Sequence, residues 1–192
     1  MKEFFKKYSY IIVSKLFVTQ IAIALFGTGL AFASAYAEST SLRICSSIGA
    51  TVFYLFLIYA HMWEIGAKDG ISAEARKTSR GLWRGFLMGV CANALNLLLA
   101  LTITVTGLAH VADGLGQTAT AAALLIEGMY FGILSTPISG IVLSGYAWVY
   151  FAITVPAIVV CGVAYILGSF NLRATNILIP KNKDVKNNGR PR

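Results

Sequence analysis

The run LFVTQIAIALFGTGLAFASAYA, residues 16–37, contains no Asp, Glu, Lys or Arg and follows a short basic N-terminal segment. A bilayer has a hydrocarbon core of about 30 Å, which a helix of about 20 apolar residues crosses. Three further runs without charged residues have this length: residues 44–63, 85–108 and 146–170. The sequence therefore predicts an all-α fold, an integral membrane bundle of four transmembrane helices.

The composition excludes an ordinary soluble protein. Hydrophobic residues make up 57% of the chain and charged residues 12%, whereas soluble domains have about a quarter of their residues charged. No polar stretch is long enough to form a second domain. We expect a single transmembrane helical domain over residues 1–179 and a basic cytoplasmic tail over residues 180–192.

The Lys and Arg residues are distributed unevenly along the chain. All but Arg43 lie before the first apolar run, between the second and third runs, or after the fourth. Lys and Arg are retained on the cytoplasmic flanks of membrane helices, so we expect a multi-pass protein of the plasma membrane with both termini in the cytoplasm. These flanking charges favour anionic lipid headgroups as partners and disfavour nucleic acid. The three groups are Lys2, Lys6, Lys7 and Lys15; Lys68, Arg76, Lys77, Arg80 and Arg84; and Arg173, Lys181, Lys183, Lys186, Arg190 and Arg192.

The first apolar run permits a second interpretation. Its last residues, Ala35-Tyr36-Ala37, have the A-x-A form of a signal-peptide cleavage site. The run is longer than the roughly 7–15 apolar residues of a signal peptide, which favours a retained helix. Cleavage after Ala37 would leave three spans with an outside N-terminus, and the distribution of Lys and Arg would still obey the charge rule.

The stretch over residues 117–144 is less regular than the four runs. It is apolar over residues 118–134, but Glu127 interrupts it, and Pro137 and Gly140 follow. A fifth full crossing would place the basic tail outside, against the charge rule. We therefore expect an outer-side re-entrant or amphipathic segment between the third and fourth helices. A hairpin of two short half-helices, broken near Pro137, would also return the chain to the same side.

Four polar side chains inside apolar segments are candidates for an intramembrane site. Gln20 lies in the first run, Asn93 and Asn96 lie in the third, and Glu127 is the only acidic residue within an apolar stretch. Carboxamides hydrogen-bond between membrane helices, and a buried ionisable group in the membrane indicates a functional site. Alternatively, the asparagines only join helices, and Glu127 faces headgroups or water.

Glycines recur every four residues at the start of the third run, at Gly81, Gly85 and Gly89. Small residues with this spacing allow the backbones of two membrane helices to approach closely. We expect this face of the helix to pack against another helix.

A string of titratable residues, His61, Glu64, Lys68 and Asp69, lies at the inner end of the second run. On a continuing helix, side chains three or four residues apart share a face, which could form a metal site or a proton relay. The same residues are also explained as an anchor, with Trp63 at the headgroup level and a helix that ends near Asp69.

No catalytic motif stands out in the chain. It contains no Walker A loop, no G-x-S-x-G elbow and no HExxH sequence, which are the signatures of common nucleotide-binding, hydrolase and zinc sites. The three cysteines are widely spaced and are expected to serve in packing. We therefore expect no catalytic residue, no metal and no cofactor.

The element Trp63-x-x-Gly66-x-Lys68-Asp69, followed by a basic turn and an Asn-bearing run, resembles a group of small, uncharacterised membrane proteins of Gram-positive bacteria. The resemblance covers residues 59–96. It implies a four-span topology and no assigned activity. The chain departs from that group at Gly70-Ile71, where Asn-Arg is expected.

These features predict a non-enzymatic accessory or regulatory membrane subunit. Its small-residue faces would bind its own helices, a partner protein or a second copy. The alternative is a small transporter or channel component that uses Gln20, Asn93, Asn96 and Glu127 as its polar path. An intramembrane enzyme is a third and weaker alternative.

Overall fold

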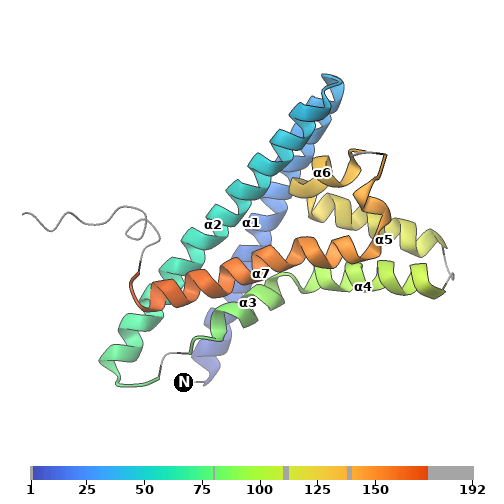
Figure 1. Cartoon of the computed structure of the whole chain (residues 1–192). Helices are drawn as coiled ribbons and strands as arrows, with labels where there is room; N and C mark the ends of the chain where they lie inside the picture. The colour runs from blue at the N-terminus through green and yellow to red at the C-terminus, as the bar shows by residue number, and fades with distance from the viewer. Residues whose placement is uncertain (1, 80, 110–112, 138–139, 173–192) are drawn as a thin grey trace, which may run out of the picture.

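A computed structural model describes residues 2–79, 81–109, 113–137 and 140–172, and these residues form an all-helical protein (Figure 1). The all-α class predicted from the apolar runs is therefore confirmed. The predicted tail over residues 180–192 lies outside the described residues. The elements are α1 (Lys2–Tyr36), α2 (Thr40–Ala75), α3 (Arg84–Ala92), α4 (Ala94–Ala109), α5 (Asp113–Ile126), the 3-10 turn η1 (Gly128–Tyr130), α6 (Phe131–Ser135), the 3-10 turn η2 (Leu143–Gly145) and α7 (Ala147–Ser169).

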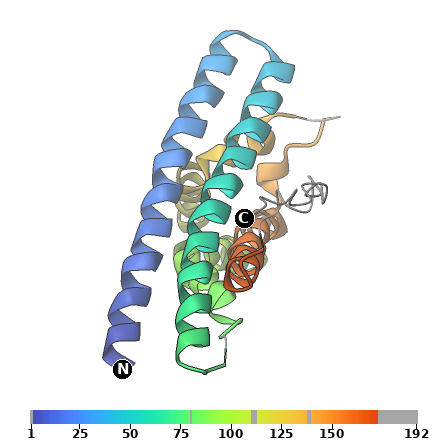
Figure 2. The same ribbon diagram turned by 90° about the vertical axis from the view of Figure 1, so that its left-hand side faces the viewer.

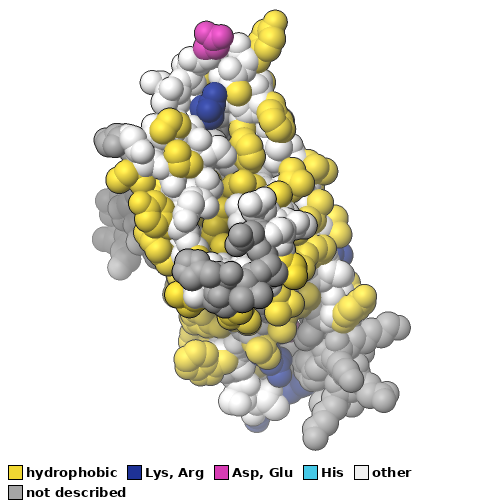
Figure 3. Space-filling model, turned by 90° about the vertical axis from the view of Figure 1, so that its right-hand side faces the viewer, with side chains coloured by type: hydrophobic (Ala, Val, Ile, Leu, Met, Phe, Trp, Pro, Cys, Tyr) yellow, Lys and Arg dark blue, Asp and Glu magenta, His cyan; other side chains and the backbone are white. Residues whose placement is uncertain are grey.

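The described residues contain three to five candidate membrane spans. Three helices are long and apolar enough to cross a membrane: Tyr10–Tyr36, Thr40–Ala75 and Ala147–Ser169. Two bent pairs, α3 with α4 and α5 with α6, add up to two more. In Figure 3, hydrophobic side chains cover the middle of the face, and most of the visible Lys and Arg lie near its lower end. This arrangement is consistent with a membrane protein.

The helices α1 and α2 form a long antiparallel hairpin (Figures 1 and 2). In the turn between them, Glu38 has φ 52°, and the hydroxyl oxygen of Ser39 accepts a hydrogen bond from the backbone N–H of Leu42 at 3.3 Å. The expectation that the second helix ends near Asp69 differs from the structure, in which α2 continues to Ala75. The segment after Asp69 includes good helix formers, and packing against α7 supports it.

The predicted helix over residues 85–108 is divided in two. Asn93 separates α3 from α4 with dihedrals of φ −95° and ψ 11°, and its Nδ2 donates to the carbonyl oxygen of Gly89 at 2.9 Å. Asn side chains compete with the helical backbone for hydrogen bonds. The two halves consequently meet at an angle of 58°.

The helix α7 crosses α2 at very short range. Gly66 and Gly70 of α2 lie directly against the backbone of Tyr165 and Ser169 in α7, so that a Cβ on either glycine would collide with a carbonyl group. The Gly66-x-x-x-Gly70 spacing is the kind that brings membrane helices together. This crossing holds α7 against the hairpin.

Two glycines of α3, Gly85 and Gly89, also pack against α7. A Cβ on Gly85 would lie 2.5 Å from Cβ of Tyr165, and a Cβ on Gly89 would lie 2.9 Å from Cβ of Cys161. Gly81 lies before α3, next to the side chain of Arg84. The helix α7 therefore packs closely against both α2 and α3.

Candidate functional site

All four residues of the predicted polar site are buried. The exposed fractions of the side chains are 1% for Gln20, 3% for Asn93, 4% for Asn96 and 3% for Glu127. Glu127 is the only charged residue among those buried in the described part of the chain. The alternative in which Glu127 faces headgroups or water therefore does not match the structure.

Glu127 lies at the sharper of the two bent helix pairs in the described residues, where α5 meets η1 and α6 at 87°. Its backbone N–H still donates to the carbonyl oxygen of Ala123 at 2.8 Å and closes α5, while its own carbonyl oxygen accepts from the N–H of Tyr130 at 2.8 Å. The helix therefore breaks at Glu127 and restarts at once in another direction. The bend directs this carboxyl group into the bundle.

The neighbouring helices α1 and α2 support the broken backbone. A Cβ on Gly27 of α1 would lie 2.5 Å from Cα of Met129, so the two backbones are in direct contact. From α2, the hydroxyl of Ser47 donates to the carbonyl oxygen of Met129 at 2.6 Å. Irregular backbone at membrane depth is stable only where protein groups or water satisfy its polar atoms. The protein thus provides a dedicated support for the bend.

The carboxyl group of Glu127 has one hydrogen-bond partner among the described residues. Its Oε1 lies 3.2 Å from the hydroxyl of Thr154 on α7, and its Oε2 is buried without a hydrogen bond. The hydroxyl of Tyr130, also buried, has no hydrogen bond to any described residue. Glu127 interacts electrostatically with Tyr54, Tyr130 and Tyr150. One acid and several hydroxyls thus share an interior region.

The helix register places Asn96 in the same layer as this carboxyl group. Ala100 of α4, Ala123 of α5 and Tyr150 of α7 form one packed cluster. Asn96, Glu127 and Thr154 each lie four residues, about one helical turn, from a member of that cluster. Because α4 runs opposite to α5 and α7 (Figure 1), the three displacements have the same direction.

The two asparagines of the predicted site form a separate hydrogen-bonded pair. Nδ2 of Asn96 donates to Oδ1 of Asn93 at 3.1 Å. Within the described residues, Oδ1 of Asn96 and Nε2 of Gln20 are buried without a hydrogen bond. Gln20 lies one turn before Ala24, whose carbonyl group touches Gly128. The structure thus buries the four predicted residues in the bundle interior but does not link the amides to Glu127 by a hydrogen bond.

A cavity, which we name the distal cavity, lies between the ends of α4 and α5 and has a volume of about 490 Å³. The hydroxyl of Tyr150 donates to the carbonyl oxygen of Ser144, a lining residue, at 3.0 Å. Beyond Tyr150, one turn along α7, lies Thr154 with Glu127. The lining residues are Ile103, Thr106, Gly107, Gly116, Gln117, Thr120, Ala121, Leu124, Ser144, Gly145 and Ala147.

The predicted cluster of His61, Glu64, Lys68 and Asp69 is divided between two faces of α2. Glu64 and Lys68 form an exposed ion pair at 2.6 Å. Asp69 instead faces α7 and accepts a hydrogen bond from the hydroxyl of Tyr165 at 2.7 Å. No group of three or more His, Cys, Asp or Glu side chains suited to a metal occurs in the described ranges.

Sequence reasoning missed the hydroxyl residues around Glu127, namely Thr154, Tyr130, Tyr54 and Tyr150. They come from two helices, α2 and α7, and from the 3-10 turn η1, and their positions relative to Glu127 depend on the bend at that residue. Thr and Tyr are common in membrane helices and at their interfaces, so nothing in the sequence distinguished these four.

Searches against protein-family models, curated proteins and solved structures found no match to this chain.

Proposed function

We propose that this chain is a small membrane transporter or channel component with an intramembrane binding site for a proton or a small cation at Glu127. The observation that carries the proposal is the buried carboxyl group, whose Oε2 has no hydrogen bond among the described residues. An ionised carboxylate in an apolar interior is very costly without a compensating positive charge. Glu127 must therefore be protonated or hold a cation for most of the time.

The neighbouring oxygens suit either ligand. The hydroxyl of Thr154 lies 2.8 Å from the carbonyl oxygen of Tyr150 and 3.2 Å from Glu127. It has one proton, so when it donates to Tyr150 it can accept a hydrogen bond from a protonated Glu127. Hard cations take oxygen ligands from carboxylate, carbonyl and hydroxyl groups. The hydroxyl of Tyr130 is a further oxygen in this region.

The proposed topology has four spans: α1, α2, the bent pair α3–α4, and α7. Lys68, Arg76, Lys77 and Arg84 lie at the end where α2 leads to α3, and the charge rule assigns that end to the cytoplasm. Both termini are then cytoplasmic, and the α5–α6 pair is a re-entrant segment entering from the outside. The distal cavity then lies on that outer side.

Flux measurements test this proposal directly. The purified chain is reconstituted into liposomes with a trapped pH-sensitive or Na⁺-sensitive dye, and proton, Na⁺ and K⁺ gradients are applied in turn. We expect a flux above that of empty liposomes for one of these ions, and its inhibition by a hydrophobic carbodiimide, which modifies protonated carboxyl groups. Peptide mapping should locate the adduct on Glu127 and not on the exposed Glu38. An absence of both flux and adduct would contradict the proposal.

Thr154→Val should weaken ion binding without unfolding the protein. The substitution nearly preserves the shape of the side chain but removes the only described hydrogen-bond partner of the Glu127 carboxyl group. A polar contact between membrane helices contributes about 0.6–2 kcal/mol, so we expect roughly a 3- to 30-fold change in the half-saturating ion concentration for flux. Thr104→Val is the matched control, because Thr104 also donates to the carbonyl oxygen four residues earlier, at 2.8 Å, and has no contact with Glu127.

The accessory subunit is the second candidate function. Gly29 of α1 and Gly49 of α2 support it, because a Cβ on either residue would meet no atom within 4 Å. Small residues on an open helix face can receive a helix of a partner. This candidate predicts that the chain co-purifies from membranes with a larger complex and that Gly29→Leu or Gly49→Leu removes the complex. Co-purification unchanged by both substitutions would contradict it.

A further inference from the structure

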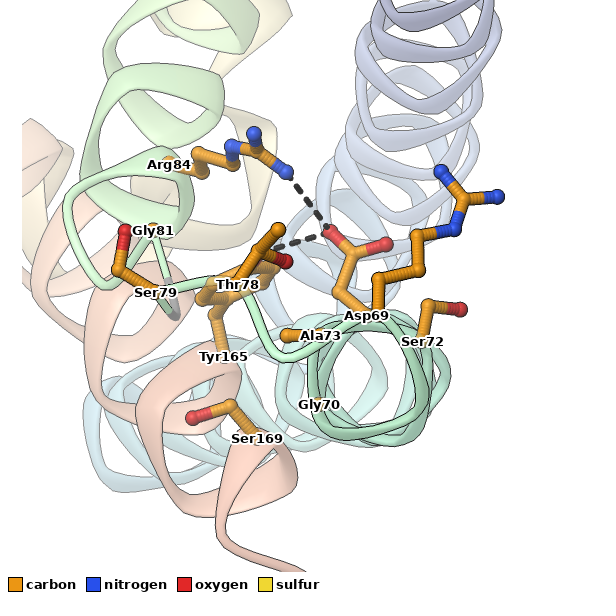
Figure 4. A pocket seen from close by; sticks show the side chains of 11 residues that line it. Asp69, Gly70, Ser72, Ala73, Thr78, Ser79, Gly81, Arg84, Tyr165 and Ser169 are labelled. Atoms are coloured by element: carbon orange, nitrogen blue, oxygen red, sulfur yellow. Dashed lines mark hydrogen bonds and ion pairs between the residues drawn. The ribbon is translucent and has the colours of Figure 1, made fainter.

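A second polar site lies far from Glu127, at the end of the bundle where α2 leads to α3 (Figure 4). Side chains from the end of α2, the following loop, the start of α3 and the end of α7 enclose a cavity of about 70 Å³. On this measure one water molecule needs roughly 10–15 Å³, so the cavity has room for a group of several heavy atoms. Its lining residues are Asp69, Gly70, Ser72, Ala73, Arg76, Thr78, Ser79, Gly81, Arg84, Tyr165 and Ser169.

The lining of this α2–α3 cavity is rich in hydrogen-bond donors and has a net positive charge. Arg76 and Arg84 are its cations, and Asp69 is its only anion. Each guanidinium group has five N–H donors in a planar arrangement that matches phosphate oxygens. The hydroxyls of Ser72, Thr78 and Ser79 add donors with rotatable protons.

Internal contacts fix the position of the single acidic group. Asp69 accepts a hydrogen bond from the hydroxyl of Tyr165 at 2.7 Å, and its Oδ2 lies 3.8 Å from NH1 of Arg84. Figure 4 shows Arg84 reaching toward Asp69 from the opposite wall of the cavity. Asp69 therefore helps to position Arg84 at the wall of the cavity. Arg76 forms no ion pair with any described residue.

We propose that the α2–α3 cavity binds a phosphate-bearing ligand, with Arg76 and Arg84 as its charged contacts. Two chemical sources of the group fit this position. One is the headgroup of an anionic phospholipid, because this end of the bundle lies at the membrane surface in the proposed topology, where each nearby Lys or Arg attracts anionic lipid. The other is a phosphorylated solute from the cytoplasm. Both present the same oxygens to the same donors.

This proposal does not depend on ion binding at Glu127. The lining includes neither Glu127 nor any of the hydroxyl residues around it. A protein without transport activity could therefore still bind phosphate here. A thermal-shift measurement on the purified full chain in detergent can therefore test the cavity alone. The probes are phosphatidylglycerol, glycerol 3-phosphate, inorganic phosphate and oleate, which is an amphiphilic anion without phosphorus.

We expect phosphatidylglycerol, glycerol 3-phosphate or both to raise the midpoint of thermal unfolding of the wild-type chain in a saturable way. Arg76→Gln and Arg84→Gln should each raise the half-saturating concentration about tenfold or more, because each removes a charge-assisted contact. Lys77→Gln is the matched control, since Lys77 is the next residue after Arg76, is exposed and does not line the cavity. Arg84→Lys keeps the charge, and its comparison with Arg84→Gln separates charge from folding defects.

The pattern across the probes identifies the source of the phosphate group. Saturation by phosphatidylglycerol alone indicates a lipid headgroup, while equal saturation by glycerol 3-phosphate indicates a soluble ligand. Three results would overturn the proposal: an equal response to oleate, an equal loss in Lys77→Gln, or no saturable response to any phosphate probe. An unchanged half-saturating concentration in Arg76→Gln would also overturn the proposal, even if Arg84→Gln fails to fold.

Discussion

Gly66→Leu is expected to prevent α7 from packing against α2 and to leave little folded protein. The glycine lies directly against the backbone carbonyl group of Tyr165, and a backbone in the middle of a helix cannot move aside as a side chain can. Overpacking of a dense interior costs about 1–3 kcal/mol and occasionally more. Here the whole crossing must separate, so we expect a loss at or above the upper end of that range.

Size-exclusion chromatography of a fluorescent fusion in mild detergent, followed by thermal unfolding of any monodisperse fraction, measures this effect. Gly49→Leu is the matched control on the same helix, because a Cβ at Gly49 would meet no atom within 4 Å. We expect the control to elute and unfold like the wild type. A monodisperse Gly66→Leu protein with an unchanged unfolding midpoint would show that the α2–α7 crossing is not as close as described.

The glycine contacts of α2 and α3 show how much of the helix packing a four-residue glycine spacing predicts. The four-residue spacing at Gly81, Gly85 and Gly89 predicts a packing face, and the structure places Gly85 and Gly89 against α7. The tighter contact at Gly66 and Gly70 has the same spacing in the sequence. The polar residues around it, however, indicate a helix end at the membrane interface. Glycine spacing therefore identifies candidate packing faces, while the closeness of each helix contact depends on which helix lies opposite.

For the polar site too, the sequence pattern identifies the residues but does not predict the bends that bring them together. Apolar surroundings were enough to single out Gln20, Asn93, Asn96 and Glu127 as residues to examine, because polar groups inside membrane segments are costly. The bends at Asn93 and Glu127 were not predicted at their observed positions. A bend depends on whether neighbouring helices can satisfy the broken backbone, and that support comes from residues distant in sequence, such as Ser47 for Met129.

Glu127→Gln is expected to abolish ion flux and at the same time to maintain or increase the stability of the protein. Glutamine has nearly the same shape as glutamate, and its side-chain oxygen can still contact the hydroxyl of Thr154. It cannot release a proton or balance the charge of a cation, so flux should fall to the level of empty liposomes. Glutamine cannot ionise, so the cost of burying a charge is absent from the variant, while its amide has a polar-group burial cost of about 1–3 kcal/mol, similar to that of the protonated acid.

This combination of lost function and retained stability distinguishes a binding site from a structural contact. Functional residues are often maintained at a cost to stability, and neutral replacements at such positions stabilise the fold. Flux and thermal unfolding should therefore be measured on the same preparation, with Glu38→Gln as the control for charge removal, because Glu38 is exposed in the α1–α2 turn. If Glu127→Gln lowers the unfolding midpoint and leaves flux intact, Glu127 stabilises the bend and takes no part in transport. If flux disappears while the midpoint holds or rises, the carboxyl group acts on the transported ion, because the fold that surrounds it is unchanged.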